Sequence, residues 1–264
     1  RKNNISIQSL ETKTIDGKEY LFAQQRELGQ PVPELLQESA LQWISQLSFP
    51  KNMRWGSYRT RYIRPIRWVV SLWNSKVVPI KLEMLVAGNQ TRGHRFLSTG
   101  YSKIKHASDY EQHLHGLKVI ADFEKRRHSI VSQVRKLEKK HDCHVDLDET
   151  LLNEVTNLVE WPTVLIGDFE KEFLELPDEV LITSMKVHQR YFPVFSSKKK
   201  KSSGEKNLLP NFVTVRNGDN KSLDTVRRGN SKVLRARLSD ARFFYQEDQK
   251  SMLDEFRKKC VKKR

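Results

Sequence analysis

The feature that most constrains this chain is a polar, basic segment that leads directly into an apolar one, TSMKVHQRYFPVF at residues 183–195. Residues 191–195 are rich in aromatic and β-branched side chains, a composition typical of a strand inside a sheet. Before them, the side chains of one helical face recur on neighbouring turns: Leu181, Ser184, Met185 and His188. We therefore predict a helix followed by a central strand, with His188 and Arg190 at the edge of a core.

A second apolar run, LLPNFVTV at residues 208–215, offers that strand a partner. Between the two runs lies SSKKKKSSGEK at 196–206, whose low complexity and polarity predict a flexible loop. An insertion of this kind at the tip of a hairpin costs little loop-closure entropy. The two runs are therefore predicted to pair as adjacent antiparallel strands.

Turn residues and hydrophobic periodicity predict the remaining elements. Asp16-Gly17 marks a hairpin between strands at 5–13 and 19–26, and Asn74-Ser75 marks a second one. The side chains expected to point from this second hairpin into the core are Trp68, Val70 and Leu72. Helices are expected at 34–47, 109–117, 122–141 with Asp122 as its cap, 147–162, and from Asn230 with an apolar stripe of Leu234, Leu238, Ala241 and Tyr245. Buried strands are expected at 118–121 and 163–167.

This mixture of elements predicts an α+β fold, with antiparallel or mixed sheets and packed helices. We expect a core domain at 1–195, a hairpin at 196–228 that completes it, and the start of a helical region at 229–264. The chain begins with Arg1 and not with Met, and it ends in a basic tail, so we expect it to be a piece of a longer polypeptide. No apolar run approaches the roughly 18 residues of a membrane helix, and no membrane partner is expected.

The formal net charge of +16 is distributed unevenly along the chain. Residues 51–96 carry 10 basic and 1 acidic side chains, and residues 196–264 carry 20 and 8, whereas residues 97–195 carry 13 and 17. Two basic regions around a mildly acidic middle suit a protein that binds a long polyanion better than one that binds a small acidic metabolite. For the C-terminal region, a solvated surface with a lysine-rich loop explains the charge equally well.

Residues 51–96 also combine arginine with aromatic side chains more densely than any other segment. Arginine binds phosphate groups through paired hydrogen bonds, and aromatic or guanidinium planes stack on unpaired bases. Within TRGHRF at 91–96, Gly93 would permit a close approach of the backbone to a ligand. The alternative is that Trp55, Trp68 and Trp73 simply belong to the core. The excess of arginine is nevertheless larger than solubility requires.

Motifs for independent chemistry are absent from the sequence. It contains no G-x-x-x-x-G-K-[ST] phosphate loop, no G-x-G-x-x-G, no G-x-S-x-G nucleophile elbow and no H-E-x-x-H zinc helix. HDCH at 141–144 lacks the second pair of ligands that a structural zinc site needs, so no metal site is expected. Cys143 and Cys260 provide no disulfide framework and fit a reducing compartment. No catalytic residue is assigned.

Several collinear blocks, spread over about residues 5–250, carry a family resemblance: FPKNMRWG, TRGHRF, VIADFEKRR, LLNEVTNLVEWPTVLIGDFEKEFLELPDEVLITSMKVHQRYFPVF, LLPNFVTVRNG and GNSKVLRARLSDARFFYQED. Together they resemble the β subunit of the bacterial-type heterotetrameric glycyl-tRNA synthetase, and the predicted fold resembles the core of such β subunits. The resemblance implies a part of a glycine–tRNA ligase that binds tRNA(Gly) and has no cofactor of its own. ATP, Mg²⁺ and the adenylate chemistry would belong to a separate α subunit or a fused α part, within an oligomer.

The basic residues named above give candidate RNA contacts for such a role, and the resemblance implies missing parts. The candidate contacts are Arg54, Arg64, Arg67, Arg92, His94, Arg95, His188 and Arg190. A helical HD-like region, which the helix at 230–248 would enter, and an anticodon-binding module would follow this chain. The four lysines near residue 200 depart from the compact hairpin of bacterial members, so a plastid or mitochondrial protein is expected if the source is eukaryotic, and a bacterial cytoplasmic one otherwise.

Two alternatives to RNA binding stay open. One is a scaffold that only docks the α and β parts, with its arginines paired internally. The other rests on fold analogy alone: an editing or substrate pocket related to that of phenylalanyl-tRNA synthetase β subunits.

Overall fold

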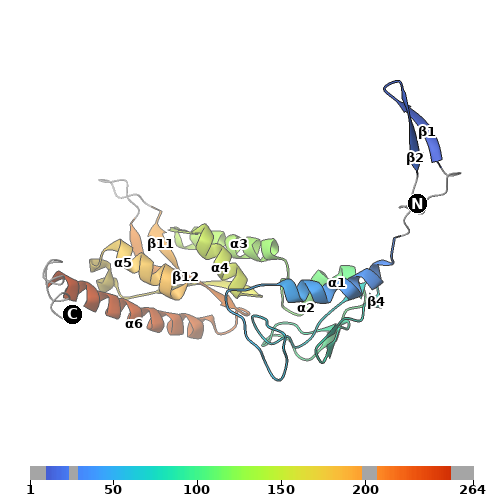
Figure 1. Ribbon diagram of the computed structural model, residues 1–264. Helices are drawn as coiled ribbons and strands as arrows, with labels where there is room; N and C mark the ends of the chain where they lie inside the picture. Colours follow the sequence, from blue (N-terminus) through green and yellow to red (C-terminus); the bar gives the residue numbers. More distant parts are fainter. Residues whose placement is uncertain (1–9, 24–28, 198–206, 251–264) are drawn as a thin grey trace, which may run out of the picture. The chain divides into compact units, whose positions relative to one another are not determined.

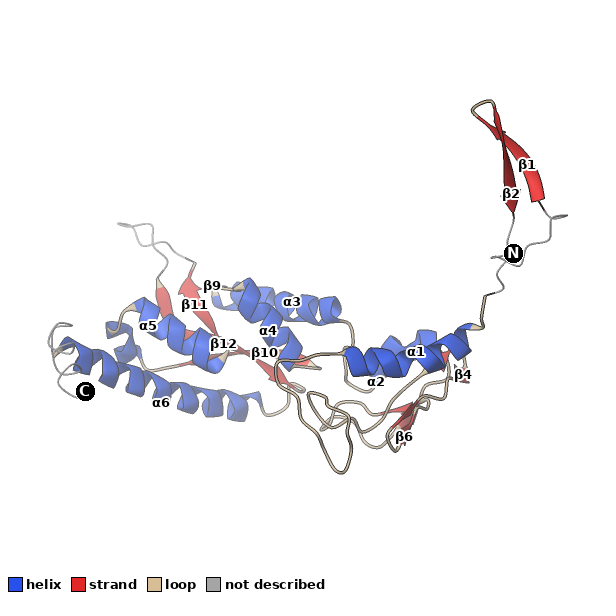
Figure 2. Ribbon diagram, viewed as in Figure 1, coloured by secondary structure: helices blue, strands red, loops and turns tan. Residues whose placement is uncertain are grey.

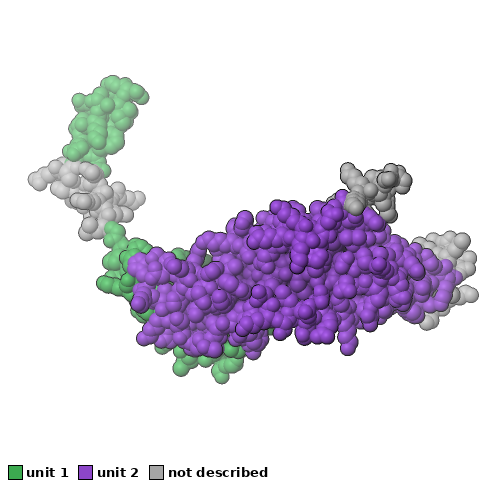
Figure 3. All heavy atoms as spheres, turned by 180° about the vertical axis from the view of Figure 1, so that it is seen from behind, with its two compact units in different colours: residues 1–89 green, residues 90–264 purple. Residues whose placement is uncertain are grey.

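The computed structural model describes residues 10–23, 29–197 and 207–250. The chain divides into two compact units, unit 1 at residues 1–89 and unit 2 at residues 90–264 (Figure 3). Each unit is described by itself. The predicted segments 1–195, 196–228 and 229–264 stay a prediction at the level of domains. No helix in the described part of the chain is both long and apolar enough to span a membrane.

The first element of unit 1 is a hairpin of β1 (Leu10–Ile15) and β2 (Lys18–Ala23) (Figure 1). Asp16 and Gly17 have φ values of 53° and 77°. Two successive positive φ values define the type I′ turn that matches the twist of the strands, and Asp-Gly is a preferred pair for it. The predicted hairpin is confirmed, although parts of the predicted strand ranges lie outside the described residues.

The rest of unit 1 contains one helix and short hairpins. Helix α1 (Val32–Gln46) follows Pro31, with a further proline in its first turn. The strands are very short: β3 (Leu72–Trp73), β4 (Lys76–Val77), β5 (Lys81–Leu82) and β6 (Leu85–Val86). Leu36 and Ala40 of α1 pack against a small buried cluster of Val78, Ile80 and Ala87. The predicted hairpin at Asn74-Ser75 is therefore present, and it joins β3 to β4.

The prediction for the inner face of this hairpin was wrong. Trp68 is 37% exposed, and Val70 and Leu72 are only half-buried. The buried side chains instead come after the turn, at Val78 and Ile80. Because the strands are only two residues long, alternation does not persist from residue 68 to the turn, and a simple two-residue period could not identify the buried face.

Unit 2 is built around a four-stranded antiparallel sheet (Figure 2). Its strands are β9 (Cys143–Val145), β10 (Pro162–Asp168), β11 (Phe192–Ser196) and β12 (Leu208–Asn217), in the order β10-β12-β11-β9. Phe192 lies opposite Val213 in the register of β11 and β12. The predicted pairing of the two apolar runs is confirmed. The central part of the predicted lysine-rich loop, residues 198–206, lies outside the described residues.

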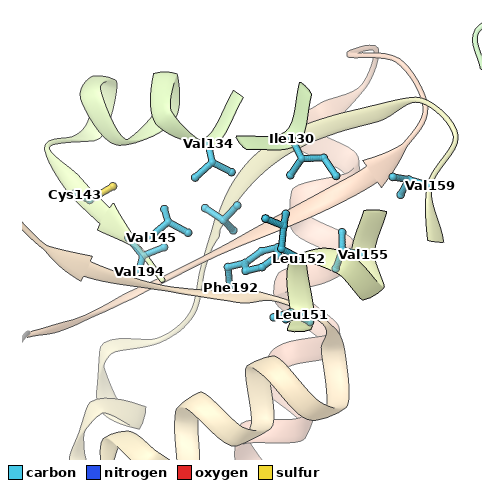
Figure 4. Packing of buried hydrophobic residues seen from close by; sticks show 11 residues of the cluster. Ile130, Val134, Cys143, Val145, Leu151, Leu152, Val155, Val159, Phe192 and Val194 are labelled. Carbon is cyan, nitrogen blue, oxygen red and sulfur yellow. The ribbon is translucent and has the colours of Figure 1, made fainter. Parts of the chain in front are cut away.

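Side chains on the two faces of this sheet enter two different cores. Phe192 and Val194 pack with α3 (Phe123–His141) and α4 (Glu149–Leu158), and Figure 4 shows Phe192 lying close to Leu152. The second core takes Tyr191, which directly precedes β11, and Phe195 of β11 together with Phe212 of β12. It is covered by the 3-10 helix η3 (Lys171–Glu175), α5 (Asp178–Thr183) and α6 (Leu223–Gln249). Unit 2 is thus a helix–sheet–helix sandwich, and the predicted α+β class is confirmed.

The remaining elements of unit 2 complete its edges. They are β7 (Gln90–Thr91), β8 (Ser102–Lys103), the 3-10 helix η2 (Ala107–Asp109), α2 (Tyr110–Gly116) and the π-helix η4 (Ser184–Gln189). Asp122 caps α3 by accepting the backbone N–H of Lys125 at 2.7 Å, as predicted. Asp148 caps α4 by accepting the N–H of Leu151 at 2.9 Å.

Two predictions about these elements were wrong. Residues 118–121 do not form a strand. The N–H of Ile120 donates to the carbonyl of Glu160, and the carbonyls of Ile120 and Ala121 accept the Arg126 side chain instead of a neighbouring strand. Helix α6 begins at Leu223 rather than at Asn230, and it continues through Gly229. A single glycine costs a helix only about 1 kcal/mol. The packing of Leu234 and Leu238 in the core outweighs this cost, and the predicted apolar stripe is present.

Candidate nucleic-acid interface

A closed loop in unit 1 at residues 53–62 separates aromatic from basic side chains. Met53 and Tyr62 exchange two backbone hydrogen bonds of 2.9 and 3.1 Å, which join the ends of the loop. The rings of Trp55 and Tyr58 meet edge to face at 6.0 Å, and Tyr62 meets Phe49 at 5.2 Å. These inner rings are half-buried at Trp55, Tyr58 and Tyr62, whereas the basic side chains are exposed at Arg54, Arg59 and Arg61. Packing of the aromatic rings therefore leaves the arginines at the surface.

The predicted contacts Arg54, Arg64 and Arg67 are all exposed. Among the described residues of unit 1, none of these three side chains has a hydrogen-bond or ion-pair partner. The only carboxylate of residues 51–96 belongs to Glu83, and it is already engaged. Its Oε1 accepts the backbone N–H of Thr60 at 3.0 Å and the Thr60 hydroxyl at 2.6 Å, and these bonds lower the pKa of Glu83. The segment thus has a single carboxylate, which also attracts Arg59, for ten basic side chains.

The TRGHRF segment contains two different kinds of residue. Arg92 and Arg95 are exposed, and their guanidinium groups lie over the rings of Tyr101 and Phe96 at 5.3 and 5.6 Å. His94 is only 1% exposed. Its Nδ1 accepts the backbone N–H of Phe96 at 3.2 Å, so its Nε2 carries the proton and donates to Asn217 at 3.1 Å. Since both ring nitrogens are engaged, His94 has no surface for RNA.

Gly93 is needed for a close approach within the chain rather than for a ligand. A Cβ at this position would lie 2.4 Å from both the Cβ and the carbonyl oxygen of Leu117. The neighbouring N–H of His94 donates to that same carbonyl at 3.0 Å. The sequence correctly indicated a site that excludes a side chain. The group that lies this close, however, is Leu117 at the end of α2. A ligand is therefore not required to explain why residue 93 is glycine.

Asn217 is a central acceptor that the sequence analysis missed. Its Oδ1 accepts the backbone N–H groups of Glu160 and Trp161 at 2.9 and 3.0 Å, in addition to Nε2–H of His94. The Asn-Gly pair at 217–218 resembles many other turns, and nothing in its spacing indicates that the amide reaches two other segments. Asn217 thus fixes the loop that bears Phe96 relative to the corner that bears Trp161.

The corner at residues 183–195 uses most of its basic side chains internally. Nζ of Lys186 lies 2.7 Å from Oδ2 of Asp146, and Nε of Arg190 lies 2.6 Å from Oε1 of Glu154. The Arg190 side chain also donates to the carbonyl of Val187, and its backbone has a left-handed φ of 59°. Arg190 therefore links residues 187–190 to Glu154 of α4. Its side chain has a structural role, which leaves it less available for RNA contact.

His188 differs from the rest of its predicted helical face. Leu181, Ser184 and Met185 are buried, but His188 is exposed. Residues 184–189 form a π-helix, whose wider turn rotates the following side chains away from the positions of an α-helix. The expectation that His188 lies at the edge of the core was therefore wrong, and its exposure keeps it available for an external ligand.

Unit 2 also contains a cleft of about 970 Å³ that the sequence analysis did not predict. We call it the Phe96 cleft and define it by six of its lining residues: Phe96, His115, Lys118, Trp161, Asp219 and Lys221. Nζ of Lys118 lies over the Trp161 ring at 5.0 Å, and the His115 ring meets Trp161 edge to face at 5.1 Å. Aromatic surface and positive charge therefore line one hollow.

Three of the shifted pKa values of unit 2 belong to groups in the cores or at a helix cap. Burial raises the pKa of Cys143 and of Tyr191, both of which lie in the cores. The N–H of Leu151, followed by Lys186, lowers the pKa of Asp148 at the start of α4. None of these groups lines the Phe96 cleft, and the described residues contain no cluster of ligands that could hold a metal ion. The arrangement favours the binding of a polyanion over acid–base chemistry.

Comparison with known proteins is consistent with this geometry. The family model described as glycyl-tRNA synthetase beta subunit matches residues 1–262. A protein of Listeria welshimeri named glycine–tRNA ligase beta subunit is 48% identical over 255 residues, which are 97% of this chain and 36% of the relative. Proteins of the same name from Bacillus subtilis and Moorella thermoacetica are 49% and 46% identical over 94% and 96% of this chain, each covered to 35%. The chain thus spans about a third of the length of these relatives.

All three of these relatives are bacterial proteins. They fit the bacterial alternative stated from the sequence and give no support to an organellar source. All four lysines on which the organellar expectation depended, residues 198–201, lie outside the described part of the chain.

Proposed function

Since the chain belongs to the glycyl-tRNA synthetase beta subunit family, we propose that it is the tRNA-binding part of a glycine–tRNA ligase. In this proposal it holds tRNA(Gly) while a separate alpha subunit, or a fused alpha part, activates glycine with ATP and Mg²⁺. The absence of a phosphate-binding loop from the sequence supports this division of labour. The chain itself contributes no catalytic residue.

One observation carries the proposal: Arg54, Arg64 and Arg67 are exposed and have no partner among the described residues of unit 1. Unpaired guanidinium groups keep all their donors for phosphate oxygens, and the release of counterions from RNA adds to the binding free energy. The scaffold alternative requires arginines that are paired internally. Glu83, the single acid of residues 51–96, is held by Thr60 and forms no ion pair with Arg54, Arg64 or Arg67 in the described part of the chain.

The other predicted contacts divide by their surroundings. Arg92, Arg95 and His188 are exposed, and they stay within the proposed surface. His94 is removed from it because the ring is buried and both nitrogens are engaged. Arg190 contributes at most a secondary contact, since Glu154 already holds it. Assembly into an oligomer and the cellular compartment remain predictions from the family resemblance.

The proposal is tested by replacing Arg54, Arg64 and Arg67 with glutamine and measuring the affinity for a tRNA(Gly) transcript against salt concentration. Each phosphate contact that is lost should reduce the slope of log K against log salt by about 1. A matched control replaces Arg228, Lys232 and Arg237, three exposed side chains of α6, so that the same charge is removed elsewhere.

We expect the unit 1 variant to lose the larger part of the slope and the control to lose little. Equal losses in both variants would show that the charge acts without a defined contact in unit 1. Negligible tRNA binding by the unaltered chain at low salt would favour the docking scaffold instead.

A further inference from the structure

Phe96 is the most exposed aromatic ring of unit 2 among the described residues. It is 81% exposed, although phenylalanine is usually buried. Its backbone is nevertheless held in place, because the Phe96 N–H donates to the buried His94 ring, which Asn217 holds. An apolar ring whose backbone is anchored at the surface beside a cleft offers a flat face to a ligand.

A second aromatic ring lines the same cleft. The backbone N–H of Trp161 donates to Asn217, the residue that also holds His94. The Trp161 ring packs against His115 and Lys118. One acceptor, Asn217, therefore holds the backbone segments that bear both aromatic residues of the Phe96 cleft.

The charged groups around the cleft are mainly positive. Lys118 and Lys221 line it, and neither side chain has an ion-pair partner among the described residues of unit 2. The one carboxylate of the cleft's defining residues, Asp219, is partly engaged by the N–H of Lys221 at 3.2 Å and lies 3.8 Å from Arg216. Arg95, next to Phe96, adds a further exposed cation. This distribution complements a phosphate-bearing ligand better than an acidic or neutral one.

We propose that the Phe96 cleft binds unpaired nucleotides of an RNA strand. A base stacks on Phe96 or Trp161, and the flanking phosphates contact Lys118 and Lys221. A volume of about 970 Å³ is at the upper end of the range for ligand sites, which leaves room for a nucleotide and its neighbours. Base–aromatic stacking is independent of sequence, because every base has a flat face.

This inference rests on the proposed function and adds a site to it. The arginines of unit 1 would contact phosphates of paired or unpaired RNA alike. The Phe96 cleft, in contrast, requires bases that are free to stack, since a duplex hides the faces of its bases. The Phe96 cleft therefore distinguishes single-stranded from double-stranded RNA, whereas the arginines of unit 1 do not.

The test compares a short single-stranded RNA with a blunt-ended duplex, both labelled with fluorescein, on the full chain and on Phe96→Ala. Stacking on one aromatic side chain accounts for a loss of roughly tenfold in affinity when it is removed. We expect this loss for the single strand and no change for the duplex. Because Phe96 is exposed, its replacement should not impair folding. The matched control is Phe244→Ala, which removes a ring of α6 that is 63% exposed.

The possible outcomes distinguish a failure of the cleft inference from a failure of the proposed function. If the full chain binds tRNA(Gly) but Phe96→Ala binds the single strand as tightly as the full chain does, the cleft inference is overturned and the function stands. If the full chain binds no RNA at low salt, both fail. If Phe96→Ala weakens binding of the alpha partner and leaves the single strand unaffected, the cleft is a protein-docking site and the inference is wrong.

A second variant tests the phosphate contact in the same cleft. Lys118→Gln should reduce the salt slope of single-strand binding by about 0.7 and leave the aromatic rings in place. An unchanged slope would contradict the contact between Lys118 and phosphate.

Discussion

The arginines of the two units have different surroundings. In unit 2, Arg190 binds Glu154, Arg127 binds both carboxylate oxygens of Glu149 at 2.8 and 2.6 Å, and Arg126 donates to three backbone carbonyls. In unit 1, Arg54 and its neighbours Arg64 and Arg67 have no such partner among its described residues. Arg126, Arg127 and Arg190 of unit 2 thus stabilise the fold. Arg54, Arg64 and Arg67 of unit 1 remain free for an external anion.

The cause of this difference is the local supply of acceptors. Residues 97–195 contain 17 acidic side chains for 13 basic ones, but residues 51–96 contain 1 for 10. The structure uses the single acid, Glu83, to hold Thr60. Arginine content alone therefore does not distinguish a binding surface from a structural ion-pair network, and the ratio of acids to bases along a segment does so better.

Among the substitutions that test the contrast between the two groups of arginines, the largest loss of stability is expected at Arg126. Its guanidinium group donates to the carbonyls of Thr156, Ile120 and Ala121 at 3.1, 2.6 and 2.9 Å. Arg126→Met should lower the free energy of unfolding by about 3 kcal/mol, because partly buried carbonyls lose charged donors. The measurement is urea unfolding of the full chain, with Arg54→Met as the matched control, which should change stability by less than about 0.5 kcal/mol. Similar losses in both variants would remove the distinction between the units.

A smaller effect should appear at Asp148, one of the acids that unit 2 uses internally. The N–H of Leu151 and the charge of Lys186 lower the pKa of Asp148 below its ordinary value of 3.8. A lowered folded-state pKa means that the carboxylate stabilises the fold above pH 3.8, and that this contribution is lost as the pH falls below that value. Asp148→Ala should cost about 1 kcal/mol at pH 7, the usual contribution of a helix cap. Unfolding measured from pH 7 to pH 3 should show this cost shrinking. A cost that does not depend on pH would contradict the role of the charge.

The smallest effect is expected for the pair of Arg190 and Glu154. Both side chains are substantially exposed, at 40% and 45%, so solvent screens their attraction. A double-mutant cycle with Arg190→Gln and Glu154→Gln should give a coupling of about 0.5 kcal/mol in urea unfolding. A steep loss of tRNA affinity in Arg190→Gln, with no coupling to Glu154, would instead move Arg190 into the RNA-binding group.

Local signals allowed much of the fold to be predicted from the sequence. The Asp16-Gly17 turn, the cap at Asp122 and the pairing of residues 192–195 with 208–213 all depend on residues close in sequence or on strong apolar runs. The errors arose where tertiary contacts decide. A π-helix rotated His188 outward, and short strands left Trp68 at the surface.

The candidate site was less predictable for the same reason. Arg54, Arg64 and Arg67 were identified from composition, and their exposure supports them. The role of Asn217 could not be predicted, because it depends on three segments that meet only in the folded chain. The Phe96 cleft likewise forms from residues that lie far apart in sequence.

Chemical modification of arginine tests the central claim most directly, because it reads each side chain separately. The full chain is treated with phenylglyoxal, with and without tRNA(Gly), and the modified residues are quantified by mass spectrometry. We predict that Arg54, Arg64 and Arg67 react readily and are protected by tRNA, while Arg126 and Arg190 react slowly with no effect of tRNA. Protection at Arg126 and Arg190 with none at the three arginines of unit 1 would contradict the account.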